Sequence, residues 1–391
     1  MEYTVACNWD PELINRIDYP EVKSLFGGLP ETLISGGRSS LLTRNVQENK
    51  IREYIQQVHT RGLNFDYNIN SACLSNQELT ASGYRDIMRY LEWVCSLGVD
   101  SLTISNTNLI EIVKKNFPQL KIKVSTYQKV SNPCQAKRFE DMGVDALMLS
   151  EHINRNFKIL AAIRKSVKCK LVLVANVGCI YNCPNMHSHA NCTAHSGAAG
   201  EVDSIFTEAY NLYCFQKRLS NREELIKIRW IRPEDVPYYE EIGIDMLKII
   251  ERSSSTQALE ERVKAYSERK YDGNLLNFLG QAWDIKRTDE QIKKSITIKV
   301  KSENTAKAMM LLKAFSSSLP ELFSLDNRKL GSDFIQSFIN RDCNATNCSE
   351  CGNCKKIAEE TISIIDQKKL DIADQRIKEV RNSVIDGSLL Y

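Results

Sequence analysis

The chain has 391 residues, of which 42% are hydrophobic and 26% are charged, and this composition is typical of a folded globular protein. Its length predicts two to three domains, although one α/β barrel takes up about 250 residues. Basic side chains exceed acidic ones by only three, which is too few to indicate a nucleic-acid or membrane surface.

The cysteine content is the most informative part of the composition. Thirteen cysteines are present, and four of them lie between Cys343 and Cys354. The first residues, MEYTVACNWD, lack the basic and apolar regions of a signal peptide, and no apolar run approaches the length of a membrane span. We therefore expect a cytoplasmic protein without a membrane span. Clustered thiols in that compartment bind metals more often than they form disulfides.

Three segments along the chain resemble one another. They are LGVDSLTISN, MGVDALMLSE and IGIDMLKIIE, and each places a glycine before an aspartate and an apolar run. Gly98, Gly143 and Gly243 suit the left-handed position after a helix, and the apolar runs suit strands buried on both faces. Each segment therefore predicts a helix followed by a parallel strand.

The same pattern extends to eight strands alternating with helices. We predict strands near 3–8, 64–70, 99–105, 121–127, 144–150, 169–177, 224–231 and 244–250. The fold class is therefore α/β, with a TIM-type (β/α)8 barrel over residues 1–270. A doubly wound sheet is the alternative, but the residues after the first strand, ACNWDPEL, contain no glycine-rich phosphate loop.

Two regions depart from the alternation. A long loop over 176–222 follows the sixth predicted strand, on the face where barrel enzymes carry their active sites. Residues 271–391 predict a smaller, α-rich C-terminal domain, which we call the tail. In the tail we expect a strand at Ser295–Val300, a helix at Thr305–Ser317 and a final mixed-charge helix at Ile357–Val384.

The long loop is rich in soft metal ligands, which indicates a zinc or iron–sulfur site. Three histidines accompany the thiols. The cysteines are Cys179, Cys183, Cys192 and Cys214, and the histidines are His187, His189 and His195.

The fourth ligand of this site has two candidates. Cys214 is closer in sequence to the other three, although its context, NLYCFQ, also suits a small core residue. Cys73 follows the second predicted strand, across the barrel from the sixth, and reaches the site only if the loop folds over the opening. We favour Cys214 and expect Cys73 to line the pocket.

The tail holds a second thiol group, Cys343-x4-Cys348-x2-Cys351-x2-Cys354. Short spacings of this kind let the backbone wrap a compact cluster, as in ferredoxins. Structural zinc sites usually combine two cysteine pairs separated by a dozen or more residues. We therefore predict an iron–sulfur cluster held by these four residues, with zinc as the alternative.

Further residues are expected at the mouth of the barrel, where they would bind an anionic substrate. Ordinary helix capping is an equal alternative for the segment from Arg252 to Thr256, and Arg232 also belongs to a common helix start, RPED. The predicted substrate-binding residues are Gly36, Gly37, Asn70, Cys73, Arg232 and Arg252, with Arg38 as a catalytic residue.

Four stretches together resemble the U-32 peptidase family, the collagenase-like group. They are FDYNINSACLSN, residues 123–128, ANVGCIYNCPNMHSHANC and IRPEDVPYYEEIGIDMLKIIER. The resemblance covers the barrel, and the cysteine-rich tail is similar to that of a subgroup. It implies a barrel with a 4Fe-4S cluster held by four cysteines. It also implies relatives that hydroxylate ubiquinone precursors or RNA without oxygen, and others described as proteases.

Three functions follow from these observations. The leading hypothesis is an iron–sulfur oxidoreductase that modifies an anionic organic, peptide or RNA substrate, with His187 or His189 moving protons and the tail cluster relaying electrons. The second is a peptidase, in which His187, His189 and His195 would hold zinc. The third is a non-catalytic electron-carrying subunit. A separate electron-donor or paralogous protein is the expected partner.

Overall fold

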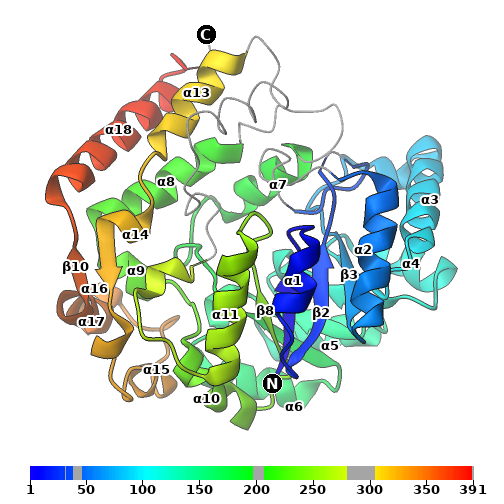
Figure 1. Ribbon diagram of the computed structural model, residues 1–391, viewed down its shortest axis with the longest axis horizontal. Coiled ribbons are helices and arrows are strands. Elements are labelled where there is room, and N and C mark those ends of the chain that lie inside the picture. Colours follow the sequence, from blue (N-terminus) through cyan, green and yellow to red (C-terminus); the bar gives the residue numbers. More distant parts are fainter. Residues whose placement is uncertain (31, 38–45, 197–206, 280–303, 390–391) are drawn as a thin grey trace.

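The computed structural model describes residues 1–30, 32–37, 46–196, 207–279 and 304–389 (Figure 1). Eight parallel strands form a closed barrel, in which β8 pairs with β1. This confirms the predicted TIM-type barrel. The strands are β1 (Glu2–Ala6), β2 (Val22–Gly27), β3 (Asn64–Ile69), β4 (Ser101–Ile104), β5 (Lys121–Val124), β6 (Ala146–Met148), β7 (Lys170–Val174) and β8 (Met246–Ile249).

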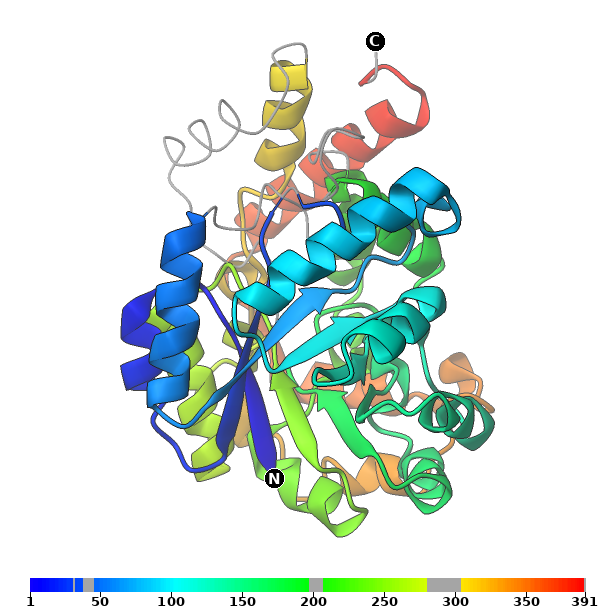
Figure 2. The ribbon, with the colours of Figure 1, turned by 90° about the vertical axis from the view of Figure 1, so that its right-hand side faces the viewer.

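Helices surround the barrel, and all strands point to the same end (Figure 2). The three predicted glycine joints, in which a glycine ends a helix before a strand, are confirmed. Gly98, Gly143 and Gly243 have φ of 84°, 78° and 83° and precede β4, β6 and β8. The helices of this part are α1 (Pro11–Arg16), α2 (Glu48–Thr60), α3 (Ala81–Ser96), α4 (Thr107–Asn116), α5 (Pro133–Asp141), α6 (Phe157–Ser166), α7 (Met186–Ser196), α8 (Thr207–Ser220), α9 (Glu223–Lys227), α10 (Val236–Glu241) and α11 (Thr256–Glu268).

One predicted strand is wrong and one was missed. Residues 224–231 form the short helix α9 and an irregular segment, whereas Val22–Gly27 form β2. The carbonyls of Ile226 and Trp230 accept hydrogen bonds from the buried Arg155 guanidinium, at 2.7 and 2.9 Å, instead of pairing in the sheet. The sixth predicted strand is therefore β7, Gly36 and Gly37 follow β2, and Cys73 follows β3. Cys73 still lies across the barrel from the long loop.

The interior of the barrel combines buried polar and charged side chains with a small apolar cluster of Ala146, Met148, Val172 and Met246. Buried Asp66 accepts hydrogen bonds from the hydroxyls of Ser101 and Thr103, at 3.1 and 2.9 Å, and pairs with Lys123 at 3.4 Å. The Lys248 ammonium lies 3.8 Å from the centre of the Phe26 ring. Alternate residues of the strands, such as Phe65 and Leu247, belong to the apolar core instead.

The tail packs beside the barrel and shares an apolar core with α8, α9 and the end of β7. Figure 1 shows α18 running alongside α8. The predicted final helix is wrong as one unit, because β10 interrupts it and pairs antiparallel with β9. The predicted strand Ser295–Val300 lies outside the described residues. The tail elements are α13 (Thr305–Ala314), α14 (Leu319–Leu322), β9 (Phe323–Leu325), α15 (Gln336–Ile339), α16 (Cys348–Cys351), α17 (Asn353–Thr361), β10 (Ile362–Ile364) and α18 (Gln367–Ile385).

No helix among the described residues is both long and apolar enough to span a membrane.

Candidate functional site at the barrel mouth

The long loop after β7 covers the end of the barrel toward which the strands point. Cys179 and Cys183 lie in the loop itself, Cys192 lies on α7 and Cys214 lies on α8. Contacts with the opposite side of the mouth show that α7 crosses the opening. The Ser35 hydroxyl donates to the Thr193 carbonyl at 3.4 Å, and Ser75 Oγ lies 3.5 Å from His195 Nδ1. The four thiols therefore occupy the loop and helices over the mouth.

Three of the thiols are electrostatic neighbours. Cys179 is exposed at the surface of the loop, and desolvation by the protein atoms beside it, together with Glu151 and Cys214, raises the pKa of its thiol. Desolvation and Cys214 also raise the pKa of Cys183. Cys73 is not among these neighbours. Cys214 is therefore an electrostatic neighbour of Cys179 and Cys183, and its role as the fourth ligand stays a prediction.

A buried arginine joins the thiol of α8 to the β7 loop. Arg218 is 2% exposed, and its Nη2 donates to Cys214 Sγ at 3.1 Å. Its Nη1 donates to the carbonyl of Gly178, the residue before Cys179, at 3.3 Å. A guanidinium donor on a sulfur atom stabilises thiolate more than thiol. The Arg218 side chain therefore adds positive charge within the thiol group.

A second cation lies on the barrel side of the thiols. Lys129 forms an ion pair with buried Glu151, whose other oxygen accepts from the Thr126 hydroxyl at 2.9 Å. Burial opposes ionisation of Glu151 and is the largest single effect, but Lys129, His152 and the hydrogen bonds to the carboxylate together outweigh it and lower the pKa of this carboxyl to about 2. Lys129 also acts electrostatically on Cys179. The pair therefore places opposite charges beside the thiol of the loop, and of the two Glu151 has the larger effect on Cys179.

The predicted histidines are spread along α7. His187 is exposed, the His189 ring stacks on Tyr210 with centroids 5.7 Å apart, and His195 faces Ser75. Sequence reasoning missed His152, which lies beneath the loop. Its Nδ1 accepts from the Asn182 backbone N–H at 3.3 Å, and burial lowers its pKa. The short segment LSEHIN around His152 carries no metal or catalytic motif that would single it out.

In the part of the chain that the structure describes, no three histidine, cysteine, aspartate or glutamate side chains converge into a metal-binding group. The mouth thiols are neighbours rather than a preformed cage. Their donor chemistry nevertheless fits a cluster, because soft sulfur ligands with adjacent cations suit the negative charge of thiolate-bound iron.

Several predicted substrate-binding residues meet on the β2 and β3 side of the mouth. Arg252 Nη2 donates to the Gly36 carbonyl at 2.8 Å, and the Tyr127 hydroxyl donates to the Gly37 carbonyl at 3.1 Å. Gly37 has φ of 69°, and a Cβ there would lie 2.6 Å from Asn70 Oδ1. Only glycine therefore allows this turn so close to Asn70. Arg38 follows directly and lies outside the described residues.

The remaining predicted mouth residues have local partners. Cys73 Sγ accepts from the Ser75 backbone N–H at 3.4 Å. Ser255 caps α11, since its hydroxyl accepts from the Ala258 N–H at 3.2 Å. Arg232 lies away from the mouth, where it donates to Asn327 Oδ1 at 2.6 Å and joins the barrel to the tail. Arg232 was expected at the mouth because it would have followed a strand over residues 224–231, and those residues form α9 and an irregular segment instead.

Lys248 was missed because a single lysine in an apolar strand carries no motif. Its side chain points into the barrel, is 5% exposed, and lies 3.6 Å from Met148 Sδ. Desolvation lowers the pKa of Lys248 to about 7, although Asp66 opposes the shift. A buried amine that titrates near neutrality can exchange a proton.

The tail thiols lie at the edge of a second apolar core, the one that the tail shares with α8, α9 and the end of β7. Cys343 and Cys354 pack against that core, Cys348 is exposed, and Cys348 and Cys351 begin and end α16. The structure therefore keeps the four predicted tail ligands together in one short region, next to α9.

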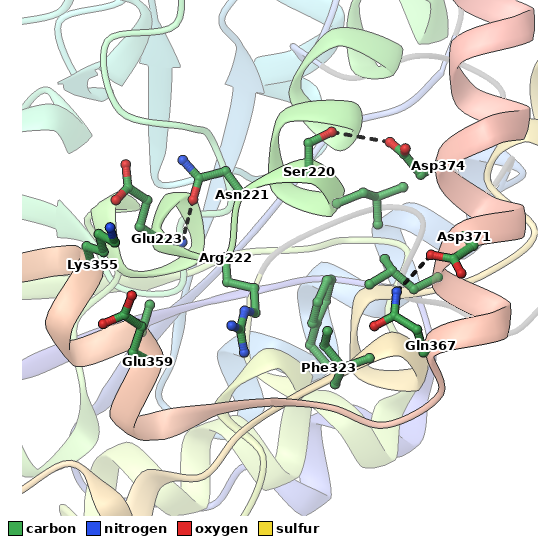
Figure 3. Close-up of a pocket in the computed structure, with 14 residues that line it drawn as sticks. Ser220, Asn221, Arg222, Glu223, Phe323, Lys355, Glu359, Gln367, Asp371 and Asp374 are labelled. Carbon is green, nitrogen blue, oxygen red and sulfur yellow. Dashed lines mark hydrogen bonds between the residues drawn. The ribbon is translucent and has the colours of Figure 1, made fainter. Parts of the chain in front are cut away.

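A cavity of about 590 Å³ lies on the seam between barrel and tail (Figure 3). It lies between the ends of α8 and α9 on one side and α17, β10 and α18 on the other. Two hydrogen bonds join its two sides. The Ser220 hydroxyl donates to the Asp374 carboxylate at 3.2 Å, and the Arg222 guanidinium donates to the Ile362 carbonyl at 3.0 Å. None of its described lining residues is cysteine or histidine, so it is separate from both thiol groups.

A family model described as peptidase family U32 matches residues 26–295, which is more than half of the chain. The chain belongs to peptidase family U32. An uncharacterized protease of Methanocaldococcus jannaschii is 28% identical to this U32 protein over 355 residues, or 90% of this chain and 92% of the relative. The solved structure of a U32 peptidase is 21% identical, with a TM-score of 0.49, over 64% of this chain and 93% of that one.

Proposed function

We propose that this U32-family protein is an iron–sulfur enzyme that carries out redox modification of an anionic organic substrate at the barrel mouth. The observation that carries the proposal is the placement of Arg218 among the thiols, with one guanidinium nitrogen on Cys214 Sγ and another on the carbonyl before Cys179. A buried cation at this point offsets the charge of several thiolates.

The residues that would hold a 4Fe-4S cluster are Cys179, Cys183, Cys192 and Cys214. A bound cluster would supply one-electron transfer at the opening of the barrel. Thiols must lose their protons when they ligate a metal. Desolvation and Glu151 raise the pKa of Cys179, and Lys129 and Arg218 offset only part of that rise, so proton loss there would have to be driven by the metal itself. The fit therefore rests on donor type and on the position of the Arg218 guanidinium.

Other residues of the mouth would bind and orient the substrate. Arg252 and the backbone of Gly36 and Gly37 line the β2 side, where a guanidinium can orient an anionic group by charge-assisted hydrogen bonds. Arg38 is proposed to join them. His187 and His189 on α7 are the proposed proton carriers, and Lys248 is a further group in the barrel able to hold or release a proton near pH 7.

Anaerobic purification tests the proposal. We expect iron and acid-labile sulfide in comparable amounts and a broad visible absorbance, which Cys179→Ser and Cys183→Ser should reduce. Arg218→Met should also lower cluster content, whereas Lys217→Met, the neighbouring cation on α8, should not. Protein that keeps all its iron in the Cys179→Ser/Cys183→Ser double variant would show that the mouth thiols hold no cluster.

A peptidase is the second candidate, favoured by the name of the family and of the archaeal relative. In that case His187, His189 and His195 would hold zinc with one open position. The anaerobically purified protein would then contain zinc instead of iron and would cleave peptides. Substitution of these histidines by alanine should abolish cleavage while leaving the barrel folded.

A further inference from the structure

The tail thiols lie next to the mouth loop, although more than a hundred residues separate them in sequence. Tyr181 stands between Cys179 and Cys183, and its hydroxyl donates to Asn344 Oδ1 at 2.5 Å. Asn344 directly follows Cys343. One aromatic side chain therefore links the mouth loop to the residue that follows the first cysteine of the tail run.

Cations surround the tail thiols as well. Arg341 Nη1 donates to Cys351 Sγ at 2.8 Å. Arg155 and Arg229 both act electrostatically on Cys354. The Arg229 guanidinium also lies 4.0 Å from the centre of the Tyr181 ring, so it faces the mouth loop and the tail together.

The position of Arg155 is costly unless it has a strong partner. It is fully buried, it stacks 4.4 Å from the centre of the Trp230 ring, and its hydrogen bonds go to neutral carbonyls. Desolvation, together with Arg229, lowers the pKa of this guanidinium to about 10. A thiolate at Cys354 would offset part of this buried positive charge, although desolvation outweighs the two arginines and raises the pKa of the Cys354 thiol in the absence of a metal.

The local backbone leaves the thiols free to converge. Gly352 separates α16 from α17 with φ of 63°, so the chain turns sharply between Cys351 and Cys354. Cys348 and Cys351 lie on α16, which has only four residues, and Cys343 lies near enough to Cys354 to influence it electrostatically. In the structure as described, the thiols do not yet form a ligand cage, so binding would draw α16 toward Cys354.

We infer that Cys343, Cys348, Cys351 and Cys354 bind an iron–sulfur cluster at the contact between tail and barrel, separate from the mouth thiols. The site rests on its own motif and its own cations. This part of the inference rests on the proposed mouth cluster. If the mouth set binds its cluster, the two clusters would lie on either side of Tyr181 and Arg229. Single electrons from an external one-electron donor would then pass from one cluster to the other.

Iron and sulfide content of the full chain tests the inference. Compared with the wild type, Cys348→Ser/Cys351→Ser should lose about half of the iron and sulfide, and Cys179→Ser/Cys183→Ser should lose the other half. Full retention of iron in the tail variant, or zinc in place of iron at the tail, overturns the inference. Loss of all iron in the tail variant, with none lost in the mouth variant, would leave the tail site standing and remove the proposed mouth cluster.

Alkylation of the wild-type protein gives a readout that does not depend on folding of a variant. Iodoacetamide should modify exposed Cys348 in metal-free protein and fail to modify it after anaerobic reconstitution with ferrous iron and sulfide. Cys134, which is exposed on α5 far from both thiol groups in sequence, is the internal control and should react equally in both samples. Equal modification of Cys348 before and after reconstitution overturns the inference.

Discussion

The two thiol groups of this protein are built in opposite ways. The mouth group draws its cysteines from the β7 loop, α7 and α8, and tertiary packing brings them together. The tail group lies within a single short run that ends on α17. Its spacing is visible in the sequence, whereas the neighbourhood of Cys179 and Cys214 depends on how α8 returns to the loop. The comparison teaches that local motifs reveal ligands more readily than assembled ones.

The groups also differ in how their cations are held. At the mouth, Lys129 is paired with the buried carboxylate of Glu151. At the tail, Arg155 is held by aromatic rings and backbone carbonyls. The mouth should therefore be more sensitive to the loss of one partner of a charged pair.

The largest expected effect is at the mouth. Lys129→Met leaves the Glu151 carboxylate buried without its cation, so we expect the free energy of unfolding to fall by about 3–5 kcal/mol. Urea denaturation measures the loss. The double variant Lys129→Met/Glu151→Gln should recover most of the stability, since it removes both charges. A single variant as stable as the wild type would show that Glu151 has another strong partner.

A second prediction concerns the charged interior below the mouth. The folded-state pKa of Lys248 is about 7, against an ordinary value of 10.5, so the unfolded chain binds more protons between these pH values. The free energy of unfolding of the wild type should therefore increase as the pH rises above 7. Lys248→Met, whose new side chain would lie against Met148 and Phe26, should be more stable than the wild type at pH 6, and this advantage should vanish or reverse by pH 9.

The control is Lys115→Met, a surface change that should shift stability little at any pH. Thermal unfolding of the three proteins between pH 6 and pH 9 gives the comparison. Parallel curves for the wild type and the Lys248 variant would contradict a neutral amine in the barrel. Loss of enzymatic activity in a stabilised Lys248 variant would assign the amine a functional role.

The smallest expected effect is at the bridge between the two groups. Tyr181→Phe removes the hydroxyl that donates to Asn344. Because this hydrogen bond is exposed, the free energy of unfolding should fall by only about 0.5 kcal/mol. Asn344→Ala should cost a similar amount. The double variant should cost no more than either single change, because both remove one interaction. Additive losses would mean that the two side chains do not interact in solution.

Much of the barrel could be predicted from local pattern. The glycine joints mark the ends of α3, α5 and α10, because a left-handed residue after a helix and a buried apolar run are both local features. The count of eight strands was correct, but one strand was misplaced. The segment ELIKIRWI is apolar enough for a strand, and only its contacts with Arg155 and the second core show that it is not one. Strand β2, after a helix of six residues, lacked the usual spacing.

The sequence by itself determined the barrel class, the cysteine-rich loop and the compact thiol run of the tail, because these depend on periodicity and spacing within short stretches. Tertiary structure alone decided that α7 crosses the mouth, that Arg218 joins Cys214 to the loop, and that Tyr181 reaches the tail. It also decided that Arg232 faces Asn327 and that Lys248 lies inside the barrel. Such contacts join residues far apart in sequence, and their energies depend on burial and neighbouring charge, which no local pattern encodes.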